Sequence, residues 1–317
     1  MKMKIFSRCP GKIMLTALLL SAFLPTAKAQ TISQVSPTRD TVNDFSSYDS
    51  IYGPYFNTYP GDATNGVGVF HASDTSVTPG GQHFVGAQSS CLQDSLITAS
   101  ATSLSVTGHV QMTGSGGVSM VDGNSGSASW LGYSRVTVSF NLDKPFNYSL
   151  QASTLFVTNQ IELAPAAYLV LSRNQYPDVA AFGNSRHAGY TSLPAAGTSS
   201  GVLPAGSYTF HAEASESGGV DFIHSPTAEN YFVSFTLTVT PVPQPPVITA
   251  FIPNGTGAFN LIWNAPQAGN YRVLSSTDLT AWSELIPSSA RPSGLNTNVV
   301  SAITGSNQGF FRVEYLP

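Results

Sequence analysis

Apolar and polar residues alternate with a period of two along most of this chain. The stretch 135–142 reads RVTVSFNL and the stretch 232–239 reads FVSFTLTV, so every second residue is apolar. Alternation of this kind gives a strand one buried and one solvated face, which is typical of antiparallel sheets. Glycine-rich clusters at 114–117 and 122–126 separate such runs, and no long stretch has helical periodicity. The sequence therefore predicts an all-β protein.

A proline-rich segment, TPVPQPP at 240–246, divides the alternating runs into two groups. Proline fixes φ and lacks a backbone donor, so this density of prolines favours an extended spacer. We expect a large domain at 30–240, a linker at 241–246 and a small domain at 247–317. Many short strands joined by glycine-rich turns favour a large antiparallel β-sandwich, jelly-roll-like, followed by a smaller β-sandwich.

The first 29 residues have the pattern of a secretory signal peptide. Basic residues precede a 12-residue apolar run at 13–24, and Ala27-Lys28-Ala29 supplies a small-x-small cleavage site. A membrane-spanning helix needs about 20 apolar residues, so we expect no transmembrane anchor. The sequence thus predicts a signal peptide at 1–29 and a mature chain from Gln30 that is secreted or held at the cell surface.

Charge and cysteine content exclude several classes of partner. Without residues 1–29 the chain has 8 basic and 17 acidic residues, a net charge of −9. Attraction to nucleic acid or to anionic lipid is therefore not expected. Cys91 is the only cysteine after residue 29, so no intramolecular disulfide can form, and we expect its side chain to be buried.

Sequence motifs for catalysis, metals and phosphates are missing. The six histidines lack the close spacing of zinc ligands, and His109 is expected on the solvated face of its strand. The loop 122–126 lacks the later glutamate of a calcium loop, so a hairpin turn is the simpler interpretation. No Gly-x-Ser-x-Gly nucleophile motif occurs, and no glycine-rich loop opens a helix. We therefore expect no metal and no cofactor, and the sequence identifies no catalytic residue.

Two ionisable residues are candidate ligand contacts. His211 and Glu213 lie two apart on the strand expected at 207–214, so both face the same side of a sheet. Glu216 and Asp221 follow closely, which makes this the densest ionisable cluster in the sequence. A pair of carboxylates would suit a glycosidase, whereas solvated charges on a sheet face are the simpler alternative.

Aromatic residues supply the other candidates. Trp130 and Trp282 offer flat faces on which sugar rings can stack, whereas Trp263 alternates with apolar neighbours and is expected in a core. A crowd of tyrosines and phenylalanines occupies 45–68 without clean alternation, so we expect irregular structure with one or two short strands there.

Two resemblances to known families follow from longer motifs. FNLIW at 259–263, YRVLSSTDL at 271–279 and GFFRV at 309–313 occur in an order that resembles small fibronectin type III-like modules of secreted bacterial proteins. That resemblance covers about 70 residues and implies a small β-sandwich, although the chain stops where a final strand would begin. LPAGSYTFHAEAS at 203–215, followed by strand 231–239 and the prolines, is similar to exosortase-sorted (PEP-CTERM-type) exported proteins. This second resemblance implies export and no particular enzyme.

These observations favour two functions. The first is an exported, non-enzymatic β-sandwich protein for cell-surface, matrix or glycan interaction, whose partner is an extracellular glycan or a surface protein. The second is a secreted polysaccharide-active enzyme with an accessory C-terminal module. A groove that gathers ionisable residues between aromatic walls would favour the enzyme.

Overall fold

The computed structural model describes residues 5–6, 30–49, 53–77, 85–118, 126–157, 166–174, 177–185, 193–221, 227–254, 258–301 and 308–316. All regular structure in these ranges is β-strand, which confirms the predicted all-β class. The chain divides into two compact units, one formed by Gln30–Val242 and the other by Pro243–Pro317 with residues 1–29. The division falls inside the predicted linker 241–246, although Pro241 is the last residue of a strand.

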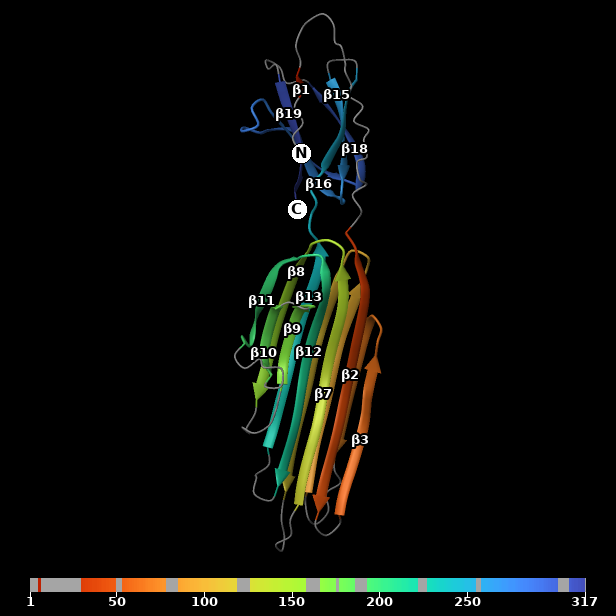
Figure 1. The fold of residues 1–317 in the computed structure, drawn as a ribbon, viewed down its shortest axis with the longest axis vertical. Coiled ribbons are helices and arrows are strands. Elements are labelled where there is room, and N and C mark those ends of the chain that lie inside the picture. The colour runs from red at the N-terminus through yellow and green to blue at the C-terminus, as the bar shows by residue number, and fades with distance from the viewer. Residues whose placement is uncertain are drawn as a thin grey trace, which may run out of the picture. The chain divides into compact units, whose positions relative to one another are not determined.

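The large unit contains two six-stranded antiparallel sheets (Figure 1). Sheet I has the strand order β10-β9-β12-β7-β2-β3, and sheet II has the order β11-β8-β13-β6-β5-β4. Sheet I consists of β2 (Ile32–Asp49), β3 (Gly53–Thr64), β7 (Gly126–Leu142), β9 (Ala166–Arg173), β10 (Asp178–Ser185) and β12 (Gly206–Asp221). Sheet II consists of β4 (Gly68–Val77), β5 (Val85–Ala99), β6 (Leu104–Val118), β8 (Phe146–Val157), β11 (Ala196–Leu203) and β13 (Thr227–Pro241).

Strands β6 to β13 have the connectivity of an eight-stranded jelly roll. Numbered one to eight along the chain, they lie in the order one-eight-three-six in sheet II and two-seven-four-five in sheet I. This is the two-sheet arrangement of a jelly roll, so the predicted architecture of the large domain is confirmed. Strands β2 and β3 extend sheet I beyond β7, and β4 and β5 extend sheet II beyond β6.

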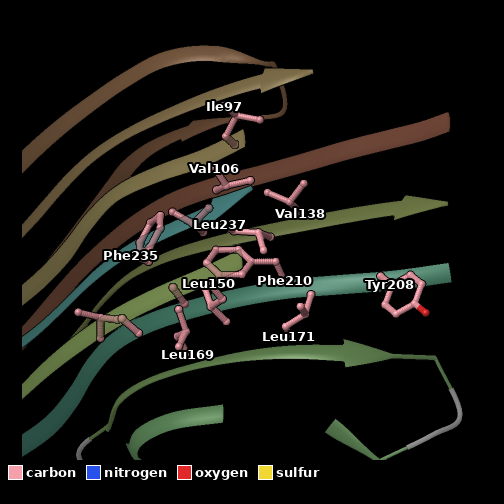
Figure 2. Packing of buried hydrophobic residues seen from close by; sticks show 14 of the residues in the cluster. Ile97, Val106, Val138, Leu150, Leu169, Leu171, Tyr208, Phe210, Phe235 and Leu237 are labelled. Carbon is pink, nitrogen blue, oxygen red and sulfur yellow. The ribbon is translucent and has the colours of Figure 1, made fainter. Parts of the chain in front are cut away.

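The interior of the jelly roll is apolar. Inward residues of β7, β9 and β12 meet those of β6, β8 and β13, and Figure 2 shows this packing with Ile97 of β5 beside it. The rings of Phe210 in sheet I and Phe235 in sheet II pack edge to face, with centroids 5.2 Å apart. These side chains occupy the apolar positions of the period-two runs, so their burial, at about 25 cal/mol per Å², holds the two sheets together.

The interior between β2 and β5 is polar instead. Asn43 Nδ2 donates to the carbonyl of Ser89 at 3.0 Å, and the Ser89 hydroxyl donates back to Asn43 Oδ1. Cys91, which is fully buried as predicted, donates from Sγ to the carbonyl of Val42 at 3.2 Å. A Cβ on Gly132 of β7 would overlap the Met112 side chain, so the two sheets approach closely here. Hydrogen bonds from side chains to the opposite sheet therefore join β2 and β5.

A buried arginine, Arg39 of β2, lies in the same polar interior and contacts β4. The Arg39 guanidinium donates to the carbonyl of Gly68 at 2.9 Å and to the carbonyl of Gly66, and the whole residue is only 1% exposed. Its charged carbon lies 5.1 Å from the centre of the Phe70 ring. Burial lowers the pKa of Arg39, because a charged group loses its hydration inside a protein.

The smaller unit is a β-sandwich with its own core. One sheet has the order β14-β15-β18, and the other has the order β1-β19-β16-β17. The strands are β1 (Ile5–Phe6), β14 (Val247–Pro253), β15 (Ala258–Ala265), β16 (Gly269–Ser276), β17 (Ser283–Arg291), β18 (Gly294–Ser301) and β19 (Gln308–Leu316). Trp263 lies in this core, as predicted: it is 1% exposed and its Nε1 donates to Asn298 Oδ1 at 2.9 Å.

The prediction for residues 45–68 was wrong. Strand β2 continues to Asp49 and β3 runs from Gly53 to Thr64, so most of this segment is long, regular hairpin rather than irregular structure. Its backbone completes the edge of sheet I, where pairing with β7 fixes the strand conformation without an alternating apolar pattern.

Candidate functional site

The outer face of sheet I brings together residues from four strands. Strand register places Glu213 of β12 between Tyr168 of β9 and Arg135 of β7, and Arg135 opposite Asp40 of β2. Side chains directly opposite on neighbouring antiparallel strands lie within contact distance on the same face. We call the resulting group the sheet I cluster; its members are Asp40, Tyr133, Arg135, Thr137, Tyr168, His211 and Glu213.

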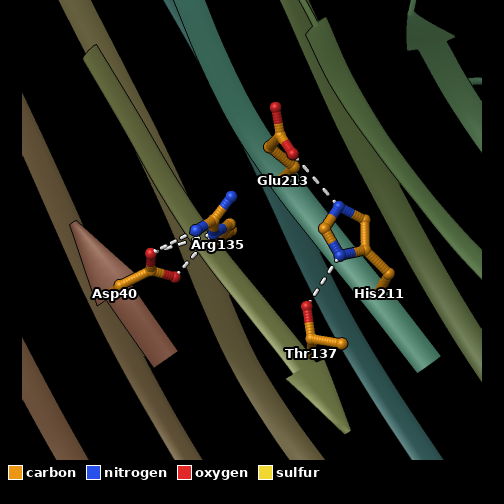
Figure 3. Close-up of polar contacts among 5 residues, drawn as sticks. All are labelled: Asp40, Arg135, Thr137, His211 and Glu213. Carbon is orange, nitrogen blue, oxygen red and sulfur yellow. Dashed lines mark hydrogen bonds and ion pairs between the residues drawn. The ribbon is translucent and has the colours of Figure 1, made fainter. Parts of the chain in front are cut away.

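His211 links Thr137 and Glu213 in one half of the cluster (Figure 3). Its Nε2 lies 3.1 Å from Glu213 Oε2, and its Nδ1 lies 2.8 Å from Thr137 Oγ1. The imidazole also packs against the Tyr168 ring at a centroid distance of 5.4 Å. The side chains of His211 and Glu213 are 23% and 21% exposed, so the pair is half-buried on the face but accessible from solvent.

Arg135 forms the second half of the cluster. Its Nε lies 2.7 and 2.9 Å from the two carboxylate oxygens of Asp40, and a terminal nitrogen lies 2.7 Å from Oδ2. This bidentate geometry is the strongest form of the arginine–carboxylate pair. The guanidinium carbon stands 4.5 Å from the centre of the Tyr133 ring. The hydrogen bond to Asp40 raises the pKa of Arg135, because it stabilises the charged guanidinium.

Glu213 is an ionised acceptor. Burial raises the pKa of Glu213, but hydrogen bonds from His211 and Ser215, with the charges of His211 and Arg135, outweigh burial and lower the pKa. A carboxyl group that serves as general acid needs a raised pKa near the operating pH. Glu213 is therefore suited to hold a positive or hydrogen-donating group rather than to deliver a proton.

The chain of contacts from Thr137 through His211 to Glu213 has the residue types of a nucleophile, a base and an orienting carboxylate. Acyl transfer also needs free donors aimed at the developing oxyanion, usually backbone N–H groups. Thr137 lies in the middle of β7, with Thr38 of β2 and His211 of β12 as register partners on its two sides. The backbone beside Thr137 is thus engaged in the ladders of two neighbouring strands.

The other sequence candidates lie apart from this cluster. The backbone of Trp130 belongs to β7, while its side chain lies outside the described residues. Trp282 belongs to the smaller unit, where its Nε1 donates to the carbonyl of Leu279 at 3.2 Å and its ring faces the Arg312 guanidinium at 4.8 Å. Glu216 is 1% exposed and points to the interior, opposite to Glu213, so these two carboxylates do not share a face. The side chain of Asp221 lies outside the described residues.

A second polar group lies on the outer face of sheet II. Asp94 of β5 contacts His71 Nδ1 with one carboxylate oxygen, and its other oxygen is 3.3 Å from His109 Nε2. The His71 and His109 side chains are 64% and 31% exposed, in keeping with the solvated position expected for His109. Cross-strand register alone aligns the three residues, and no spacing in the sequence indicates them.

Two features are absent from the described ranges. No three His, Cys, Asp or Glu side chains there are placed to hold a metal ion. None of these residues forms a helix long and apolar enough to cross a membrane.

Comparisons with known proteins give no relative. No protein-family model matches the chain, and no curated protein or solved structure is significantly similar to it.

Proposed function

We propose that this protein is exported through residues 1–29 and acts without catalysis at the cell surface or in an extracellular matrix, where it binds a glycan. The binding surface is the outer face of sheet I. Export rests on the basic and apolar N-terminus with its small-x-small site, and it agrees with the implication of the exosortase-type resemblance.

The row Tyr168–Glu213–Arg135–Asp40 is the observation that supports glycan binding. It crosses four adjacent strands on one face, with Tyr133 beside it, so aromatic faces and charged hydrogen-bonding groups lie side by side along the row. Sugars present apolar ring faces and many hydroxyls, which match aromatic packing and charge-assisted hydrogen bonds respectively. Both carboxylates of the row already have cationic or imidazole partners, which supports recognition over proton transfer.

The smaller unit supports an accessory role. Its two sheets, β14-β15-β18 and β1-β19-β16-β17, form a small β-sandwich, which agrees with the architecture that the resemblance of 247–317 to fibronectin type III-like modules implies. We assign the role of an accessory module to this unit.

Glycan-array binding of chain 30–317, together with reducing-sugar release from a polysaccharide panel, tests the proposal. Binding without sugar release is expected. Tyr168→Ala and Arg135→Gln should each weaken binding at least tenfold, because each removes one face or one bidentate contact of the row. Phe232→Ala is the matched control, since Phe232 is a half-buried aromatic residue on the opposite sheet, packed on His109 at 5.4 Å.

Sugar release that disappears in Glu213→Gln or Thr137→Val would replace this proposal with the polysaccharide-active enzyme. If Tyr168→Ala and Arg135→Gln bind as tightly as the control Phe232→Ala, the glycan does not bind at the outer face of sheet I. Detection of Met1 in secreted material by N-terminal sequencing would contradict export by signal cleavage.

A further inference from the structure

We propose that two copies of this chain pair through β19, so that the β19-β16-β17 sheets of two smaller units form one continuous sheet. The partner strand is a second β19, antiparallel to the first. The inference goes beyond the proposed function but rests on the export proposed there, because cleavage after residue 29 removes β1 from the edge of β19.

The outer edge of β19 accepts antiparallel strands. Ile5 pairs with Gly309 and Phe6 with Gln308, so a two-residue strand already lies on this edge at its first residues. Along Phe310–Leu316, no other strand of the described residues pairs with that edge. An edge of this kind presents unpaired backbone donors and acceptors, which template the addition of a further strand.

The opposite edge of the same sheet is formed by β17, and this edge is protected from strand addition. β17 contains Pro287, and its pairing with β16 shifts register twice. Proline and bulges block strand addition at an edge. β19, with the sequence QGFFRVEYL, contains no proline, and its pairing with β16 is regular throughout.

Charge selects one register for self-pairing. If the two units form a continuous sheet with both cores on the same side, each residue of one β19 lies opposite a residue of the other β19 whose side chain is on the same face. The two-fold axis that relates the copies then passes between two identical residues, one from each copy. An axis at Arg312 opposes two arginines, and an axis at Glu314 opposes two glutamates. An axis at Val313 instead places Arg312 of each copy opposite Glu314 of the other, and Phe311 opposite Tyr315.

The outer face is already arranged for this pairing. Arg272 of β16 lies 3.6 Å from Glu284 of β17 and 2.7 Å from Glu314 of β19, so charges alternate across the sheet. The second copy's Arg312 continues that alternation beyond Glu314. On the inner face, Phe311 and Tyr315 belong to the core but are only partly buried, and the second strand covers them. Opposite charges and aromatic pairs directly across antiparallel strands are both stabilising.

The test is the mass of chain 30–317 in solution, measured by sedimentation at concentrations up to the high micromolar range. The expected result is a monomer–dimer equilibrium. Arg312→Glu opposes glutamates at both sites and Glu314→Arg opposes arginines at both, so each alone should weaken the dimer roughly tenfold to a hundredfold. An equimolar mixture of the two variants restores opposite charges at both sites, and a heterodimer should form.

Arg291→Glu is the control, because it makes the same charge change on β17 and should leave the dimer intact. A dimer that forms again when Arg312→Glu and Glu314→Arg are mixed shows that both variants are folded. It would also establish the register in which Arg312 lies opposite Glu314. A monomer at every concentration, or a dimer unaffected by both substitutions, would overturn the proposal. Export is read separately by N-terminal sequencing, so failure of one proposal is distinguishable from failure of the other.

Discussion

The jelly roll of β6–β13 and the flanking strands β2–β5 share the same two sheets, but different forces hold their interiors together. Between β12 and β13, the contact consists of apolar side chains such as Phe210 and Phe235. In the flank, it consists of hydrogen bonds such as the Asn43–Ser89 pair between β2 and β5, and of the buried Arg39 of β2, which donates to the carbonyl of Gly68 in β4. Burial is insensitive to direction, whereas hydrogen bonds need aligned partners. The flank should therefore depend on correct geometry more than on volume.

Truncation in the apolar half should have the largest effect. Phe235→Ala removes a ring that is 4% exposed and packs on Phe210, and the cavity left behind adds to the lost transfer free energy. We expect a loss of about 3–5 kcal/mol in the free energy of unfolding, measured by urea denaturation of chain 30–317. A loss under about 1 kcal/mol would contradict the assignment of this half as the apolar core.

Arg39→Ala comes next and tests the polar half. It leaves the carbonyls of Gly66 and Gly68 without their donors, and we expect a loss of about 2 kcal/mol in the same measurement. Arg39→Met keeps most of the volume and removes the donors. If hydrogen bonding rather than packing holds the flank, Met should be nearly as destabilising as Ala; a fully stable Met variant would show that packing decides there as well.

The Asn43–Ser89 contact across the sheets offers a smaller and sharper test. Asn43→Ala and Ser89→Ala should each cost about 1–2 kcal/mol, since each removes one partner of a buried hydrogen bond. In the double variant the losses should fall short of additivity by about 1 kcal/mol, because both substitutions break one contact. Full additivity in this double-mutant cycle would mean that the two residues act independently.

Glu213 on the outer face should have the smallest effect. Its pKa is lowered in the folded state, so its contribution is present above the ordinary glutamate pKa and is lost as pH falls through the lowered value. Glu213→Gln should cost about 0.5 kcal/mol at pH 7, given its partial exposure, and progressively less below about pH 4. Urea denaturation of both proteins at several pH values measures the difference. A difference that grows towards acid pH would contradict the lowered pKa.

The contrast between the halves also explains what the sequence could and could not predict. The jelly-roll strands were predictable because Val136, Val138 and Phe140 alternate with polar residues, and period two encodes one buried face. In β2 the inward residues Thr41 and Asn43 are polar, so alternation in hydropathy vanishes although alternation in burial persists. Hydropathy patterns cannot identify such a strand.

The sheet I cluster was predictable only within one strand. His211 and Glu213 share a face because they are two apart, and the contact between them follows from that spacing. Arg135 and Asp40 join them through the register of three strands, which depends on contacts distant in sequence. The sequence contains those residues, but local patterns contain no information on which strands become neighbours.

The buried thiol of Cys91 can serve as a probe of how often the polar half opens. Its thiol lies fully covered between β5 and β2, against the carbonyl of Val42 and close to Gly132. A thiol reagent can modify it only during moments when the two strands separate. The labelling rate therefore reports how often the flank opens, and comparison with the rate of global unfolding tells whether the flank opens alone or only together with the jelly roll.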